Sequence, residues 1–235
     1  MNRILFVATM CAIMLSSCKS GGRSQEPEAV SEPLLAETEE IVPYFNPAFL
    51  SGPIPPTVEA RMRGKSYPDD ATIGLDELRY LEVAYYDYDG VQHMGELVCN
   101  AAIAQDLLEI FKALYEAKYP ICRIRLVDDY DASDDRSMEA DNTSCFNYRT
   151  GPGTQKLSKH ARGLVIDINP LENPYIDRSG KVRPEGAEPY VDRSKDFPHK
   201  IDRDDLCYRL FIEHGFTWGG AWSTMKDYQH FEKEP

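Results

Sequence analysis

The sequence predicts an α+β domain on a mostly antiparallel sheet with helices packed on it. Segments with strand periodicity and segments with helix periodicity are mixed along the chain, without regularly alternating βαβ units. Asp89-Gly90 joins two strand-like segments and is a two-residue hairpin signal, which favours antiparallel pairing. Removing an N-terminal leader and a polar tether leaves roughly 190 residues, enough for one ordinary domain with a full core.

The chain begins like an exported lipoprotein. A single basic residue precedes an apolar run from Ile4 to Leu15, and small residues then lead to Cys18. The run is too short for a membrane span, so we expect residues 1–17 to be a cleaved signal peptide and Cys18 to carry lipid. The alternative is an ordinary secretory signal in which Cys18 is incidental. The lipoprotein reading places the protein in the cell envelope, on the periplasmic side of the outer membrane in preference to the cytoplasmic membrane.

Residues 18–45 are rich in acid, Pro, Ser and Gly and poor in aromatics, which predicts a disordered tether. About 30 residues of such coil have an end-to-end distance of roughly 30 Å, so the domain can stay at a membrane and reach cell-wall polymer. The domain is expected over residues 46–235. Its first part, within Ile41–Pro68, mixes aromatics with many prolines and is expected to be ordered but irregular.

Four further predictions cover the middle of the domain. Residues 80–88 and 91–99 are expected to form the hairpin. Residues 103–114 have helical spacing of apolar side chains, end before Pro120, and are expected to back the sheet. Residues 121–127 alternate like a strand. Residues 206–214 follow two aspartates and precede a glycine, as an amphipathic helix does.

The net charge limits the classes of partner. The formal net charge of −13 disfavours nucleic acid and anionic membrane surfaces as partners, so the lipid anchor is the only expected membrane contact. We expect a monomer.

The four cysteines of the expected domain have two alternatives. Export permits one or two disulfides, and buried free thiols are an equal alternative. The cysteines concerned are Cys99, Cys122, Cys145 and Cys207.

The most informative stretch runs from Ser158 to Asp167. It sets His160 and Asp167 seven residues apart around Gly163, which can supply the turn that lets both side chains reach one ion. The strand pattern that follows puts Asp167 on the face opposite its apolar neighbours. Near the C-terminus, His230 follows a second carboxylate, Asp227. Two histidines, one aspartate and a spare aspartate are the components of a catalytic zinc site with an open position for water.

These motifs resemble a known family. S-x-H-x-x-G-x-x-x-D followed by W-G-G-x-W and D-Y-x-H-F is similar to the zinc D-alanyl-D-alanine carboxypeptidases, the VanX/VanY-like enzymes and the phage L-alanyl-D-glutamate endolysins. Residues 142–149 and 167–175 resemble the extensin-like or VanY-like branch, and the resemblance covers about residues 95–233. It implies the Hedgehog/DD-peptidase fold.

The resemblance also implies roles for particular residues. His160, Asp167 and His230 would bind zinc, which activates a water molecule, and Asp227 would take the proton. An arginine upstream of the S-x-H motif would hold a substrate carboxylate or the developing oxyanion. Arg149 is our assignment, with Arg136 as its competitor. On the same basis Ser158 and Trp222 are placed beside the substrate, whereas Trp218 is expected in the core or pocket wall.

Other sequence patterns argue against other classes of enzyme and against a calcium site. An HExxH motif is absent, which disfavours thermolysin-type chemistry, and penicillin-binding chemistry is not expected either. The acidic run 128–141 lacks EF-hand spacing and is expected to be a solvated loop. His93, His199 and His214 are expected to be structural. The function predicted is a zinc peptidase acting on peptidoglycan stem peptides, as a D,D-carboxypeptidase. The alternatives are an L-alanyl-D-glutamate endopeptidase and a non-catalytic zinc-containing wall-binding lipoprotein.

Overall fold

The computed structural model describes residues 45–151 and 153–234. The expected signal peptide, Cys18 and nearly all of the expected tether lie outside these residues. The order of elements along the chain is β1 Phe49–Gly52, α1 Pro56–Met62, β2 Leu78–Tyr86, β3 Gln92–Asn100, α2 Ala101–Glu116, β4 Arg123–Ile124, α3 Asp134–Glu139, β5 Asn142–Thr143, β6 Val165–Asp167, β7 Tyr175–Ile176, β8 Val182–Arg183, α4 Leu206–Glu213, β9 Thr217–Trp218, β10 Lys226–Asp227 and β11 His230–Glu232.

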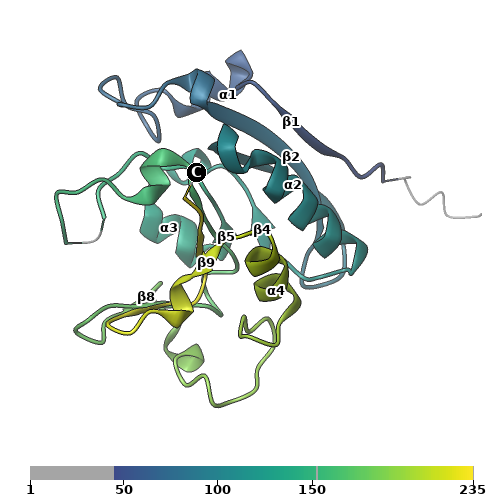
Figure 1. Cartoon of the computed structure of the whole chain (residues 1–235), viewed down its shortest axis with the longest axis vertical. Helices are drawn as coiled ribbons and strands as arrows, with labels where there is room; N and C mark the ends of the chain where they lie inside the picture. The colour runs from purple at the N-terminus through teal and green to yellow at the C-terminus, as the bar shows by residue number, and fades with distance from the viewer. Residues whose placement is uncertain (1–44, 152, 235) are drawn as a thin grey trace, which may run out of the picture. The chain divides into compact units, whose positions relative to one another are not determined.

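The long strands β2 and β3 form an antiparallel sheet with β1 on the outer side of β2. Helix α2 packs along this sheet (Figure 1). The side chain of Asn100 accepts a hydrogen bond from the Ala102 N–H at 3.0 Å and caps the start of α2. The predicted helix and its place against the sheet are both confirmed.

The predicted hairpin is confirmed, but its connection is longer than two residues. The Asp87 N–H donates to the Val91 carbonyl at 2.9 Å, so three residues close the turn. Tyr88 belongs to this turn because its hydroxyl reaches the buried carboxylates of Asp141 at 3.0 Å and Glu172 at 2.8 Å. That tertiary contact takes Tyr88 out of the strand in which its local pattern had placed it.

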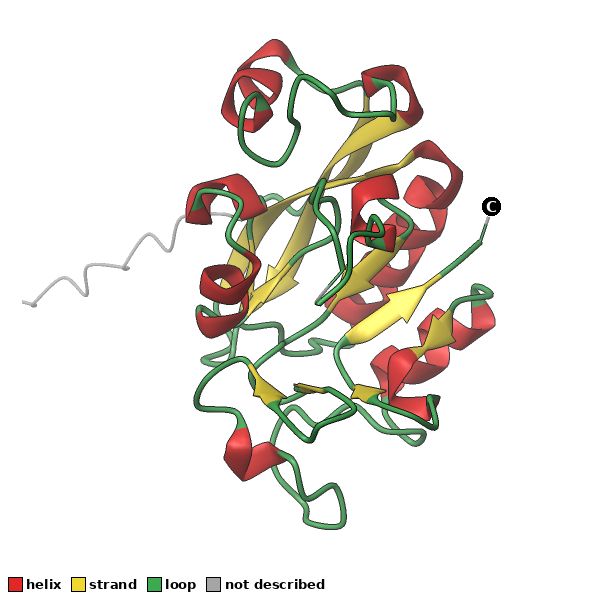
Figure 2. Ribbon diagram, turned by 90° about the vertical axis from the view of Figure 1, so that its left-hand side faces the viewer, coloured by secondary structure: helices red, strands yellow, loops and turns green. Residues whose placement is uncertain are grey.

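Three short sheets complete the fold, with strand orders β6-β11-β9, β10-β7-β8 and β4-β5. The first two are antiparallel, and β4 pairs with β5 in parallel. Figure 2 shows several short strands beside and below the lower end of the long sheet. The mixture of mainly antiparallel sheets with packed helices confirms the α+β class.

The main hydrophobic core lies between the long sheet, α2, α4 and the β6-β11 pair. Its fully buried residues include Leu81, Leu107, Ile166, Phe211 and Phe231. Phe211 stacks on Phe231 with ring centroids 4.3 Å apart, which fixes α4 against β11. The core therefore holds the two strands that carry Asp167 and His230.

Helix α4 begins where its sequence signals place it. The Asp205 carboxylate accepts hydrogen bonds from the N–H groups of Cys207 and Tyr208, and Gly215 follows the helix with a φ of +82°. The predicted helix is confirmed.

The strand predicted over 121–127 is wrong for most of its length, since only β4 forms. The side chain of Asn142 bonds both the N–H and the carbonyl of Arg125, at 2.8 and 3.0 Å, and so replaces a neighbouring strand. The chain then turns into a 3-10 helix, η2 (Val127–Tyr130). Without a long partner strand, an alternating pattern is not enough to form a ladder.

The expectation of an irregular segment within Ile41–Pro68 needs correction. The segment within Ile41–Pro68 contains both β1 and α1, and α1 buries Val58 and Met62 in a second apolar cluster. It is therefore more regular than its prolines suggested.

Of the two alternatives for the cysteines, the structure has free thiols, at Cys99, Cys122, Cys145 and Cys207. Within residues 45–151 and 153–234, no helix is long and apolar enough to cross a membrane.

Candidate metal centre and active site

Two antiparallel strands place the central residues of the site. In the β6-β11 pair, Asp167 lies directly opposite His230, so both side chains project from the same face. His160 comes from η3 (Lys159–Arg162), a 3-10 helix capped by the Ser158 hydroxyl. Gly163 ends η3 with a φ of +65°, and the chain then enters β6.

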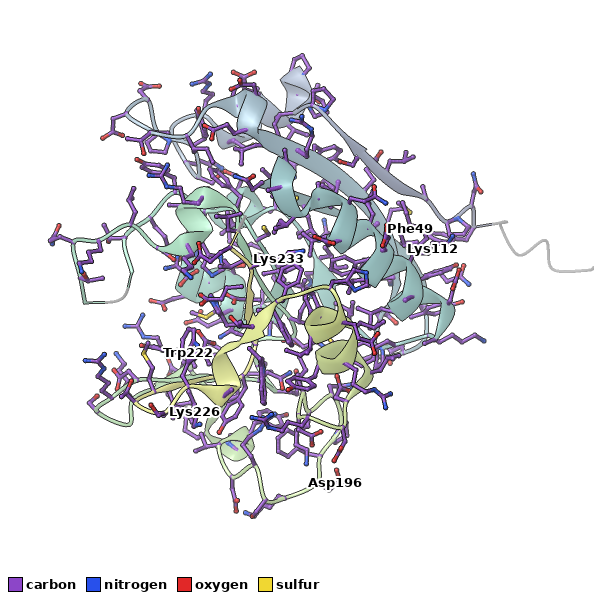
Figure 3. The ribbon with its side chains drawn as sticks, in the orientation of Figure 1. Phe49, Lys112, Asp196, Trp222, Lys226 and Lys233 are labelled. Carbon is purple, nitrogen blue, oxygen red and sulfur yellow. The ribbon has the colours of Figure 1, made fainter. Side chains whose placement is uncertain are left out.

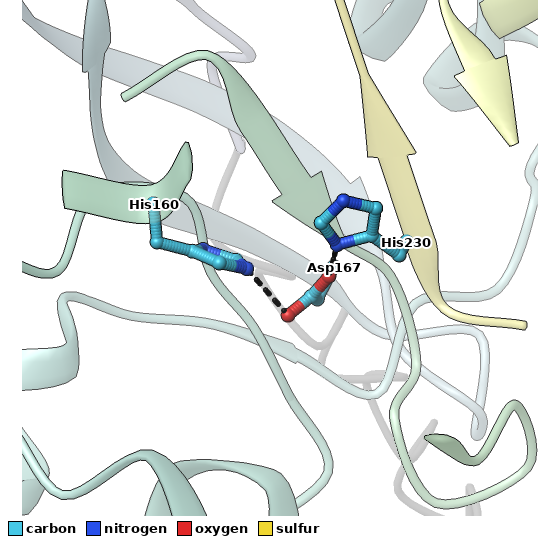
Figure 4. Close-up of side chains that lie close together, drawn as sticks. All are labelled: His160, Asp167 and His230. Atoms are coloured by element: carbon cyan, nitrogen blue, oxygen red, sulfur yellow. Dashed lines mark hydrogen bonds and ion pairs between the residues drawn. The ribbon is translucent and has the colours of Figure 1, made fainter. Parts of the chain in front are cut away.

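The three side chains meet around a single point (Figure 4). His160 Nε2 lies 3.1 Å from one carboxylate oxygen of Asp167, and His230 Nδ1 lies 3.0 Å from the other. All three residues are buried, and one donor atom from each lies within 4.8 Å of the others. Within the described part of the chain, this is the only such group of His, Cys, Asp and Glu residues.

Hydrogen bonds on the outer sides of both imidazoles fix which nitrogen faces Asp167. The His160 Nδ1–H donates to the Cys145 carbonyl at 2.6 Å. On the other ring, the His230 Nε2–H donates to Glu232 at 3.2 Å. Outer hydrogen bonds of this kind orient histidines that bind metals. His160 Nε2 and His230 Nδ1 are thereby left to converge with Asp167.

The electrostatics of the group are dominated by burial and by mutual pairing. Burial alone would raise the pKa of Asp167, but His160 and His230 outweigh it and hold that pKa well below its usual value. Burial alone would lower the pKa of His230, but its contacts with Asp167 and Glu232 outweigh burial and raise that pKa to about 10. The site thus favours an anionic carboxylate between two imidazoles, and a cation can replace their shared protons.

Asp227 lies beside this group and belongs to β10. The chain bends between β10 and β11, and one Asp227 oxygen lies 3.8 Å from His230 Nδ1. Burial raises the pKa of Asp227 to about 8, and the charges of Asp167 and Asp134 add to this effect while His230 opposes it. A carboxyl group with a pKa near neutrality can both accept and return a proton.

The W-G-G-x-W motif has a geometric reason in this structure. A Cβ atom on Gly219 would lie 2.7 Å from the Asp227 carbonyl oxygen and 2.8 Å from its Cβ. The 3-10 helix η5 (Gly219–Ala221) can therefore approach β10 only with glycine at this position. The glycine brings Trp222, which follows η5, to the site, where its ring centroid lies 5.3 Å from that of His230.

A pocket of about 210 Å³ opens over the group. Lys226 in β10, labelled with Trp222 in Figure 3, donates from its Nζ atom to the Gly220 carbonyl of η5 at 3.1 Å. The residues that line the pocket are Asp134, Met138, Arg149, Ser158, Lys159, His160, Asp167, Tyr175, Arg183, Trp222, Met225, Asp227, Gln229, His230 and Glu232. Ser158 and Trp222 thus lie at the pocket, and Trp218 lies in the core.

Unpaired polar atoms concentrate at this pocket. Among the described residues, three buried side-chain atoms have no hydrogen-bond partner: Arg149 Nε, Asp227 Oδ1 and Gln229 Oε1. All three residues line the pocket. Because a buried polar group without a partner costs free energy, such atoms are expected where a substrate or water completes the bonding.

Of the two arginines considered for substrate contact, the structure brings only Arg149 to the pocket. Arg149 Nη2 pairs with Asp134 at 2.7 Å, which fixes the guanidinium beside the site. Arg136 instead bonds the Tyr130 carbonyl and pairs with Asp131 at 2.6 Å, outside the pocket lining. Asp134 and Arg136 are both in α3, and only Asp134 lines the pocket.

Several pocket residues had not been singled out from the sequence. Glu232 could have been found, because it lies two residues after His230 in a strand and so shares its face. Asp134, Tyr175 and Arg183 carry no such signal, since they reach the pocket only through α3 and the β7-β8 pair.

Comparison with known proteins agrees with the site. Residues 152–233 match the model of a family described as D-alanyl-D-alanine carboxypeptidase. Searches of curated proteins and of solved structures gave no match. The matched segment contains His160, Asp167, Asp227 and His230 and begins after Arg149. Over these residues it confirms the resemblance to D-alanyl-D-alanine carboxypeptidases. The part of the chain that carries the His-Asp-His group is therefore similar to the D-alanyl-D-alanine carboxypeptidase family of peptidases.

Proposed function

We propose that this protein is a zinc metallopeptidase that hydrolyses peptidoglycan stem peptides, acting as a D-alanyl-D-alanine carboxypeptidase. The observation that carries the proposal is the buried His160–Asp167–His230 group with Asp227 beside it, all lining one pocket. The family match over the same segment supports it.

The donor set fits zinc. Two imidazole nitrogens and one carboxylate oxygen are typical protein ligands of a catalytic zinc site, which keeps a further position open. The outer hydrogen bonds to the Cys145 carbonyl and to Glu232 already hold both rings in the tautomers that binding needs. When bound, zinc supplies a polarised water molecule and positive charge where the oxyanion develops.

Asp227 is the proton carrier in this proposal. Its Oδ1 atom is buried without a partner at the pocket, so it is available to the attacking water. As general base it accepts the proton of that water, and as general acid it returns a proton to the leaving amine. A site used only for stability or for binding needs no such residue, which favours catalysis over the binding-protein alternative.

Arg149 stabilises negative charge on the substrate. Its pairing with Asp134 holds the guanidinium in place, and its Nε–H is buried at the pocket without an acceptor. An N–H donor that is already oriented toward a developing oxyanion lowers the barrier without reorganisation during the reaction.

The test measures metal content and cleavage on the same preparations. The purified domain, loaded with zinc, is incubated with defined muropeptides, and the products are identified by mass spectrometry. We expect close to one zinc per chain and release of the terminal D-alanine. His160→Ala should lose both zinc and activity. Asp227→Asn should keep zinc and lose activity by about 10²- to 10⁴-fold.

Asp196→Asn is the matched control, because Asp196 is fully exposed and lies outside the pocket lining. It should behave like the parent. Full activity in Asp227→Asn would refute the proposed role of that residue. Cleavage between L-alanine and D-glutamate instead would show an endopeptidase, and zinc binding without cleavage of any stem peptide would favour a wall-binding protein.

A further inference from the structure

A row of three residues crosses the small sheet beside the catalytic group. In the strand order β10-β7-β8, Asp227 lies opposite Tyr175, and Tyr175 lies opposite Arg183. Directly opposite residues in antiparallel strands project from the same face. All three side chains line the pocket, so the row runs from the proposed base to a guanidinium.

The row sets the distance between these two groups. Neighbouring strands lie about 4.8 Å apart, so the backbone of Arg183 lies about 10 Å from that of Asp227. Two residues of extended peptide span about 7 Å. Because the arginine side chain is long, its guanidinium can reach a group one or two residues away from a peptide bond held beside Asp227.

Of the Arg and Lys side chains that line the pocket, Arg183 has the longest ion-pair distance to a carboxylate. Its Nη1 atom lies 3.4 Å from an oxygen of Asp135, whose side chain is 62% exposed. Such exposed pairs contribute little and exchange readily. The other two cations that line the pocket are held more closely: Arg149 pairs with Asp134 at 2.7 Å, and Lys159 pairs with Glu232 at 3.1 Å and with Glu234.

The charge of the pocket favours such a cationic contact for an anionic substrate. The lining contains four carboxylates, Asp134, Asp167, Asp227 and Glu232. A substrate carboxylate close to the scissile bond would be repelled by them unless a cation receives it. A planar guanidinium can bind a carboxylate through two parallel hydrogen bonds, which also fixes the orientation of the peptide.

We propose that Arg183 determines specificity by binding a free carboxylate of the substrate within two residues of the scissile bond. This inference rests on the proposed function, because it assumes that a peptide is cleaved beside Asp227. Two carboxylates of stem peptides meet the description. One is the C-terminal carboxylate of the terminal D-alanine, and the other is the free carboxylate of a D-glutamate that follows the cleaved bond.

The experiment compares paired substrates that differ only in this charge. The zinc-loaded protein cleaves acetyl-L-Lys-D-Ala-D-Ala or its C-terminal amide, and a second pair carries either D-glutamate with a free carboxylate or D-isoglutamine after L-alanine. For the pair that is cleaved, the parent should prefer the free acid. Arg183→Gln should lower kcat/KM on the acid by about 10- to 100-fold, mainly through KM, and should change the amide little. Arg183→Lys should recover part of the loss.

Arg178→Gln is the control, since Arg178 is exposed, belongs to the same hairpin and is outside the pocket lining. It should match the parent on both members of each pair. The inference is overturned if Arg183→Gln retains the preference for the acid, or if it loses activity equally on acid and amide. A parent that cleaves no substrate contradicts the proposed function itself, and the role of Arg183 with it.

Discussion

The Nε2 atom of His230 lies 3.2 Å from Oε2 of Glu232, on the side of the ring opposite Asp167. Lys159, the neighbour of His160, lies 3.1 Å from the other oxygen of Glu232. Contact with His230, which is the largest cause, lowers the pKa of Glu232 to about 2, and the carboxylate is therefore anionic. Glu232 thus links the two chain segments that carry the histidines.

This relationship predicts that Glu232 tunes metal affinity. Glu232→Ala should weaken zinc binding by about 10- to 100-fold, because the His230 ring loses the acceptor that fixes its tautomer and orientation. Glu232→Gln should be milder, since an amide oxygen still accepts the bond. Competition with a chelator of known affinity measures the effect. Glu234→Gln, which changes a second partner of Lys159 without touching His230, should leave zinc affinity unchanged. Equal affinities in all variants would contradict this role.

Gly163 gives a prediction about folding. Its φ is +65°, and an added Cβ would lie 2.7 Å from the backbone nitrogen of Asn100. Gly163→Ala should therefore destabilise the protein by roughly 1–3 kcal/mol through backbone strain and the forced shift of β3. It should also weaken zinc binding, because the turn holds His160 relative to Asp167. Gly153→Ala is the comparison: it has the same φ of +65° but nothing within 4 Å of the added Cβ. Chemical unfolding of both variants separates conformational strain from steric overlap.

The buried pair of Asp141 and Glu172 predicts a pH dependence of stability away from the metal centre. Burial is the main cause that raises the pKa of Glu172 to about 7 from 4.5, with the charge of Asp141 next. Because the folded-state value exceeds the unfolded one, this contribution is complete below about pH 4.5 and is lost as pH rises through about 7. The other groups at the pair are the Tyr88 hydroxyl, the Cys122 thiol and the ring of His199 stacked on Tyr88.

Glu172→Gln should remove that dependence. Between pH 5 and 8 the parent should lose on the order of 3 kcal/mol relative to the variant, as follows from a pKa of about 7 in the folded protein against 4.5 in the unfolded chain. Urea unfolding at several pH values gives the two curves. Glu188→Gln, an exposed residue, is the control. Parallel curves for parent and Glu172→Gln would show that the carboxyl pair does not titrate in this range.

The N-terminal motif supports a separate prediction. We propose that Cys18 carries the lipid anchor, on the basis of the Leu15-Ser16-Ser17-Cys18 sequence. Cys18→Ser should move the protein into the soluble envelope fraction and leave the activity of the isolated domain as it is. Fractionation without detergent measures this. A Cys18→Ser protein that stays with the membranes would contradict the anchor.

The sequence by itself determined those features that depend on local pattern. The helical spacing between Ile103 and Leu114, the aspartates before α4 and the Asp89-Gly90 turn signal predicted elements that the structure contains. The two motifs around His160 and His230 identified the residues that the structure brings together. The structure agrees with these predictions because each of them depends on neighbours in the chain or on a family pattern with fixed spacing.

Only the tertiary structure decided what depends on distant partners. Residues 121–127 have a strand pattern, but the Asn142 side chain forms hydrogen bonds with both the N–H and the carbonyl of Arg125. These backbone groups therefore do not pair with a neighbouring strand, and the ladder ends there. The pairing of Arg149 with Asp134 arises from helix packing, and the row from Asp227 to Arg183 arises from strand register. Periodicity tells which face a side chain occupies, whereas the partner across that face is set by how separate segments pack, which no local pattern encodes.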